Sequence, residues 1–224
     1  MNEAQRAGDS TGSGALEPRW PATLAVVVAL VLYVALPAKL VLGPKLFIPA
    51  LEVALLLILT FLSPKRSAAE ARHIRVMAML VIALVNLANI ISVGLLVADL
   101  LSGTSGITGT TLVYSALSVW STNVIVFGLW FWELDRGGPA RRNQLPARFP
   151  DFLFPQMVAK DVAPPHWGPG FIDYMYVALT NATAFSPTDT MPLSRLSKSL
   201  MTAESLVSMI TVVVVAARAI NILR

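Results

Sequence analysis

The chain contains no cysteine among its 224 residues. Disulfides, thiolate metal sites and cysteine nucleophiles are therefore excluded together. Charged residues are also scarce, at 13% of the chain, whereas hydrophobic residues make up 55%. A typical soluble domain has about 25% charged residues. The composition therefore predicts a membrane protein.

Sequence motifs of catalysis are absent as well. The chain holds no phosphate-binding glycine loop, serine nucleophile elbow, zinc motif or catalytic carboxylate pair, so we predict no enzymatic activity and no cofactor. Its two histidines, His73 and His166, have no second histidine or carboxylate at ligand spacing, which argues against a metal site. The net charge of +4 comes without a recognition motif, so nucleic-acid binding is not expected.

Long apolar runs dominate the chain after a polar start. Residues 1–19 are rich in Gly, Ser, Thr and mixed charge, which predicts a disordered tail. Four runs follow, each near the roughly 20 residues with which a helix crosses a bilayer. They are Trp20–Leu42, Leu46–Leu62, Val76–Leu101 and Leu112–Trp132. Residues 20–132 are therefore predicted to form a four-helix transmembrane region, with a tight hairpin at Gly43 and Pro44.

The rest of the chain has a different pattern. Residues 133–170 are polar and rich in proline and arginine, which predicts an extramembrane loop. Residues 171–224 begin with a short amphipathic segment and a turn, and continue into the apolar run Leu200–Ala217. The whole sequence predicts an all-α multi-pass transmembrane bundle of about five spans plus a short re-entrant or pore-helix-like segment.

Lys and Arg accumulate on one predicted side of this bundle, formed by the tail, the loop between the second and third runs, and residues 133–170. Its basic residues are Arg6, Arg19, Lys65, Arg66, Arg72, Arg75, Arg136, Arg141, Arg142, Arg148 and Lys160. The loops of the other side hold only Lys39 and Lys45. The positive-inside rule therefore predicts a cell-membrane protein with a cytoplasmic N-terminus. Whether residues 171–187 cross the membrane or re-enter stays open, because the remaining charges fit both.

The segment 171–192, FIDYMYVALTNATAFSPTDTMP, resembles the pore segment of potassium channels. Those channels typically read F-x-D-A-x-Y, a Thr-rich helix end and then T-T-V-G-Y-G-D-x-T-P. The residues in step with that pattern are Phe171, Asp173, Tyr176, Thr180, Thr183, Asp189 and Pro192. The resemblance implies a pore helix, a loop and an inner helix. Residues 185–188 read F-S-P-T in place of V-G-Y-G, which argues against a carbonyl-lined potassium filter.

The last quarter of the chain also resembles an uncharacterised family of bacterial multi-pass membrane proteins. The resemblance rests on the F-x-D-Y-x-Y start at Phe171, the T-x-F-x-x-x-D pattern from Thr183 to Asp189, and the basic residues Arg195 and Lys198. It implies a bacterial membrane protein without implying a particular activity.

Polar residues within the apolar segments are the candidate functional residues, because such groups are costly in hydrocarbon and normally face protein or water. The pore-lining candidates are Thr183, Phe185, Ser186, Thr188, Asp189, Glu204, Ser208 and Thr211. Helical spacing places the polar residues from Glu204 to Arg218 on one stripe of the last helix. Either this stripe lines a pore where Glu204 binds a cation or proton, or Glu204 and Arg218 reach the membrane interfaces from opposite helix ends. The second interpretation is favoured.

Other polar residues are predicted to have structural roles. Interhelical hydrogen bonds are expected from three residues of the third run. These are Asn86, Asn89 and Ser92. Asn123 is expected to make a packing contact, while Asp173 and Asp189 are expected to stabilise a helix start and a turn. The glycosylation tripeptide at Asn181 lies in an apolar stretch and is interpreted as chance.

Two functions are consistent with these features. The first is an oligomeric membrane protein that conducts ions or small solutes through a degenerate, non-potassium-selective pore, as a homo-oligomer because one pore hairpin encloses nothing. The second is a non-conducting bundle whose basic cytoplasmic loops, above all Arg136–Arg148, bind a protein partner or anionic lipid.

Overall fold

A computed structural model of the chain describes residues 19–41, 43–51, 53–54, 68–102, 108–139, 141–142, 149–159, 161–165, 167–185 and 189–222. It is mostly helical, which confirms the predicted fold class at that level. The predicted tail up to residue 18 and most of the second apolar run lie outside the described residues. Ser186 and Thr188, two of the predicted pore-lining residues, also lie outside them.

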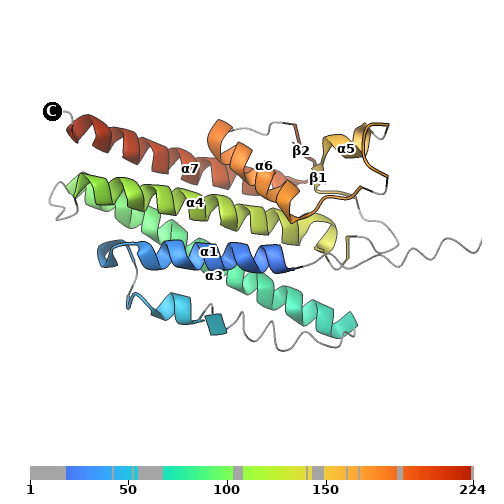
Figure 1. The fold of residues 1–224 in the computed structure, drawn as a ribbon, viewed down its shortest axis with the longest axis horizontal. Coiled ribbons are helices and arrows are strands. Elements are labelled where there is room, and N and C mark those ends of the chain that lie inside the picture. Colours follow the sequence, from blue (N-terminus) through green and yellow to red (C-terminus); the bar gives the residue numbers. More distant parts are fainter. Residues whose placement is uncertain are drawn as a thin grey trace, which may run out of the picture.

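Four helices run side by side along the long axis of the molecule (Figure 1). They are α1 (Trp20–Ala35), α3 (Ala68–Ser102), α4 (Gly109–Leu134) and α7 (Arg195–Ile222). Among the described residues, three helices are long and apolar enough to cross a membrane, with candidate spans in α3, α4 and α7. α4 is the most enclosed of the three and α7 the most exposed, so α4 forms the centre of the bundle.

The first helix is shorter than the predicted run Trp20–Leu42. It ends at Ala35 because Leu36 precedes a proline and adopts an extended conformation, with φ −63° and ψ 145°. A short 3₁₀ helix, η2 (Ala38–Leu40), follows. Gly43 then has a φ of +69°, in the left-handed region that favours glycine, at the turn that the sequence predicts. Residues 47–51 and 53–54 beyond it are helical.

The C-terminal part contains a half-length helix, α6 (Phe171–Ala184), which is about 21 Å long at 1.5 Å per residue. Strands β1 (Phe152–Leu153) and β2 (Met191–Pro192) precede and follow it, and they pair antiparallel. The chain thus returns to the end from which α6 started before α7 begins (Figure 1). α6 therefore does not traverse the bundle.

The predicted loop 133–170 contains ordered structure. The 3₁₀ helix η3 (Asp135–Gly137), strand β1 and the single-turn helix α5 (Pro155–Val158) lie in it. The pairing of β1 with β2 and the hydrogen bond from the Leu193 N–H to the Asp151 carbonyl (2.8 Å) connect this segment to the start of α7.

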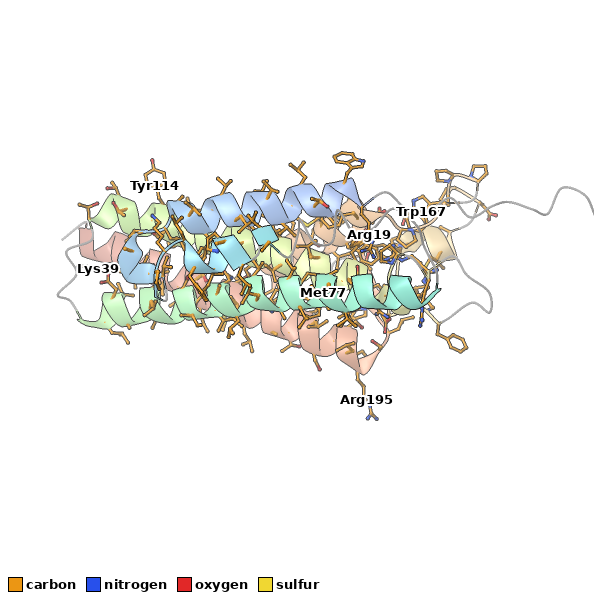
Figure 2. The ribbon with its side chains drawn as sticks, turned by 90° about the horizontal axis from the view of Figure 1, so that it is seen from below. Arg19, Lys39, Met77, Tyr114, Trp167 and Arg195 are labelled. Carbon is orange, nitrogen blue, oxygen red and sulfur yellow. The ribbon has the colours of Figure 1, made fainter. Side chains whose placement is uncertain are left out.

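Basic residues gather at one end of the bundle, which we call the arginine end and define by Arg19, Arg75, Arg136 and Arg142. Glu133 at the end of α4 has Oε1 3.7 Å from Arg19 and 3.8 Å from Arg75, so the starts of α1 and α3 meet the end of α4 there. Figure 2 shows Lys39 at the opposite end. Among the described residues, Arg19, Arg75 and Arg136 thus lie at the same end, as the predicted grouping of their segments requires.

Candidate functional site

Glu204 lies near the middle of the apolar segment Arg195–Ala217 of α7, and its side chain is fully buried. The helix begins five residues before the apolar run because Ser194 caps it, its Oγ accepting a hydrogen bond from the Ser197 N–H (3.1 Å). This extension moves Glu204 away from the helix end. Burial of the whole side chain contradicts the interpretation that Glu204 reaches outward from the helix. The alternative, a pore lining in which Glu204 binds a cation or proton, stays a prediction.

Asn181, in the last turn of α6, bonds directly to the Glu204 carboxyl group. Its Nδ2 donates to Oε2 of Glu204 at 2.7 Å and to the Met201 carbonyl at 2.9 Å. Its Oδ1 accepts from the Ser205 hydroxyl at 3.2 Å. Asn181 is interpreted from the sequence only as part of a chance glycosylation tripeptide, so its bond to Glu204 is not predicted. The available signal was its spacing of seven residues from Tyr174, which places both on the buried face of a short amphipathic helix.

Asn123 brings the central helix α4 to the same place. Its Nδ2 donates to the Ser208 hydroxyl at 2.9 Å and to the Glu204 carbonyl at 3.2 Å. The predicted packing contact is confirmed, and it is a hydrogen-bonded one. Three helices therefore converge on one buried polar group of side chains. We call this group the Glu204 cluster and define it as Asn123, Asn181, Glu204, Ser205 and Ser208.

Two oxygens of this cluster remain available. Oε1 of Glu204 and Oδ1 of Asn123 are buried without a hydrogen-bond partner among the described residues. No ion pair to Glu204 is formed within that part of the chain either. A carboxylate buried without a counter-charge is strongly unfavourable. The cluster can therefore accept a proton on the carboxyl group or hold a small cation against its oxygens.

The other predicted pore-lining residues are not brought to this cluster. Thr183 is exposed and donates to the Leu179 carbonyl of its own helix (2.8 Å), and Thr211 is buried but likewise donates to the Val207 carbonyl (2.8 Å). Phe185 and Asp189 are exposed. Within one chain the described candidates therefore do not line a common passage.

Three buried polar atoms of α3 do not form the predicted interhelical hydrogen bonds. Oδ1 of Asn86, Nδ2 of Asn89 and Oγ of Ser92 have no hydrogen-bond partner in the described structure. Asn89 and Ser92 are nevertheless buried, which agrees with their placement on a face turned toward other helices.

A second polar network lies at the arginine end and is centred on the fully buried Asp135. Its Oδ2 accepts the Tyr174 hydroxyl at 2.5 Å and its Oδ1 accepts the Asp151 N–H at 2.7 Å. Nε of Arg136 lies 3.4 Å, and Nε of Arg142 3.8 Å, from Oδ2. These contacts attach the start of α6 to the end of α4.

Arg142 is buried inside this network rather than exposed. It donates to the carbonyls of Trp132 (2.5 Å) and Pro169 (3.1 Å), and its guanidinium lies 4.8 Å from the centre of the Tyr174 ring. Arg142 is therefore not available at the surface of the loop Arg136–Arg148, whose partner binding stays a prediction. Burial also raises the pKa of the Tyr174 hydroxyl, so that it stays a hydrogen-bond donor.

Asp173 has the structural role predicted for it. Its Oδ2 accepts the Gly170 N–H at 2.7 Å at the start of α6, where a negative charge is also favoured by the helix dipole.

Comparisons with protein-family models, curated proteins and solved structures find no match to the chain. The function therefore has to be argued from the geometry.

Proposed function

We propose that the chain is an integral protein of the cell membrane that moves protons or small cations, with the Glu204 cluster as the binding site in its hydrophobic interior. The observation that carries the proposal is the complete burial of Glu204 with one carboxyl oxygen unpartnered. An ionisable residue deep in a membrane-spanning segment is by default a functional residue.

Membrane insertion is supported by the three long apolar helices α3, α4 and α7. In this arrangement the arginine end faces the cytoplasm, because basic residues accumulate there and Lys39 lies at the other end (Figure 2). α6 is then a re-entrant helix that enters from the cytoplasmic side. The C-terminal end of α7 lies on the outer side.

The position of α6 favours a cation over an anion. A half-helix that ends within the depth of the membrane places the partial negative charge of its C-terminal carbonyls, roughly half an elementary charge, at that depth. Asn181, which bonds Glu204, lies in this last turn. The carboxyl group and the helix end therefore act together in attracting positive charge.

This arrangement differs from a potassium channel, in which the pore loop enters from the outside. Phe185, the first residue at the position of the filter, has a φ of +55° and an exposed side chain.

We propose a homo-oligomer, since the exposed apolar residues of α7, such as Leu206 and Val213, can face either lipid or another copy.

The proposal is tested by ion flux into liposomes that contain the purified full chain. Proton, sodium and potassium fluxes are measured for the natural protein and for Glu204→Gln, which keeps the shape and a hydrogen-bond acceptor but removes the ionisable group. Asp161→Asn, the same kind of change at an exposed loop residue, is the matched control. We expect flux of at least one cation in the natural protein and in Asp161→Asn, and its loss in Glu204→Gln.

Equal flux in Glu204→Gln and in the control would contradict the assignment of the site. The absence of flux for all three ions would contradict ion movement and favour the non-conducting bundle. Asp189→Asn, measured beside them, tests the channel-like turn after α6. Its flux should equal that of the control, because Asp189 is exposed and lies outside the cluster.

A further inference from the structure

A groove of about 380 Å³ opens between α6 and the first half of α7. Its lining includes Asn181 and Phe185 of the α6 end and Lys198, Thr202, Ser205 and Met209 of α7. Its volume lies in the range of about 300–1,000 Å³ that is typical of ligand pockets. Its walls are mainly apolar, from Phe185 at the end of α6 to Met209 on α7.

The groove has a direction relative to the bundle. Lys198 lies one turn into α7 at the arginine end, and Met209 lies 11 residues further along the helix, about 16 Å away at 1.5 Å per residue. Half of a hydrocarbon core of about 30 Å has the same length. The groove therefore extends over the depth of one leaflet, from its polar surface to the bilayer centre.

The polar end of the groove is basic. The side chain of Lys198 is exposed and forms no ion pair within the described residues. Arg195 lies one helical turn earlier, and Figure 2 shows its side chain pointing away from the bundle. A basic group above an apolar groove one leaflet deep is complementary to a phosphate group that carries an acyl chain.

We propose that this groove binds one acyl chain of an anionic phospholipid of the cytoplasmic leaflet, with its phosphate group at Lys198 and Arg195. The proposal rests on the membrane insertion proposed above but is independent of ion movement. The bound chain lies against Ser205 and Asn181, and Asn181 is bonded to Glu204. It thereby separates the Glu204 cluster from mobile lipid.

Lipid retention by the full chain is measured by native mass spectrometry after incubation with micelles of phosphatidylglycerol or of phosphatidylcholine. Lys198→Gln removes the charge at the groove, and Lys39→Gln removes an exposed charge at the opposite end as its control. Thr202→Trp fills the groove from an exposed lining position, and Ala203→Trp places the same bulk on the neighbouring exposed residue, outside the lining.

We expect one phosphatidylglycerol to be retained in preference to phosphatidylcholine. Lys198→Gln should weaken its retention about five-fold, since each basic residue near a membrane surface contributes a factor of that order. Thr202→Trp should abolish it, and the two control variants should match the natural protein. Equal retention within either pair of variants would overturn the proposal.

Resistance of the protein to alkaline extraction from membranes, measured for each variant, separates the two proposals. An inserted protein with no preference for phosphatidylglycerol overturns the lipid site alone. A protein that alkali extracts overturns membrane insertion, and the lipid site with it.

Discussion

Replacing Tyr174 by Phe removes only the hydroxyl that joins α6 to the end of α4. The hydroxyl donates to Oδ2 of the buried Asp135 at 2.5 Å. The ring itself stays, with its edge-on contacts to Phe152 and Phe154 at centroid distances of 6.1 Å and 5.3 Å and its cation–π contact with Arg142. The variant therefore isolates one hydrogen bond.

A hydrogen bond to a charged group contributes about 1.5–3 kcal/mol to stability. Asp135 and Tyr174 are both fully enclosed, so water does not replace the lost partner. For a chain of this size each kcal/mol shifts the unfolding temperature by about 2–4 °C. We expect Tyr174→Phe to unfold roughly 3–12 °C below the natural protein.

The assay is thermal unfolding of the purified protein in one detergent, followed by circular dichroism. Tyr176→Phe is the matched control, because it removes the same hydroxyl from a half-exposed side chain two residues further along α6. Its unfolding temperature should equal that of the natural protein. If Tyr174→Phe unfolds at the same temperature as Tyr176→Phe, the network around Asp135 does not hold α6 in place.

Further predictions concern pH and helix packing. Because burial raises the pKa of the Tyr174 hydroxyl above its ordinary value of about 10, the stability contributed by its protonated form is complete below that pH and is lost above it. The unfolding temperature of the natural protein should therefore fall more steeply above about pH 10 than that of Tyr174→Phe, and parallel curves would contradict this. Gly128→Ala should lower stability by about 1–3 kcal/mol, since a Cβ at that position overlaps Sδ of Met175 on α6. Gly94→Ala, whose Cβ meets nothing within 4 Å, should be neutral or stabilising in the same unfolding assay, and equal effects of the two substitutions would refute the close α4–α6 contact.

Features that depend on neighbouring residues were predictable from the sequence. The apolar runs around α3 and α4 were predicted to within a few residues of their helical ends, apart from the eight residues by which α3 starts earlier. The end of α1 before Pro37 and the turn at Gly43 follow from local backbone preferences. The gathering of arginines at one end follows from the sequence because successive predicted spans place their connecting loops on alternate sides.

Features that join distant segments were not predictable. The stripe containing Glu204 was recognised, but its depth was misjudged because a serine cap lengthens the helix at its start. The partner of Glu204, Asn181, lies 23 residues away on another helix. Asp135 and Tyr174 are 39 residues apart, and neither was predicted to have a role. A single sequence carries no direct signal for such pairs.

The sequence by itself determined that the chain is helical with long apolar segments, because hydrophobic content and helical periodicity are local properties of the chain. Only the tertiary structure decided that the chain returns, after α6, to the end where α6 begins, since this depends on the pairing of β1 with β2. It also decided that Asn123, Asn181 and Glu204 form one buried site. Hydrogen bonds between helices depend on which faces pack together, and that is a property of the whole fold.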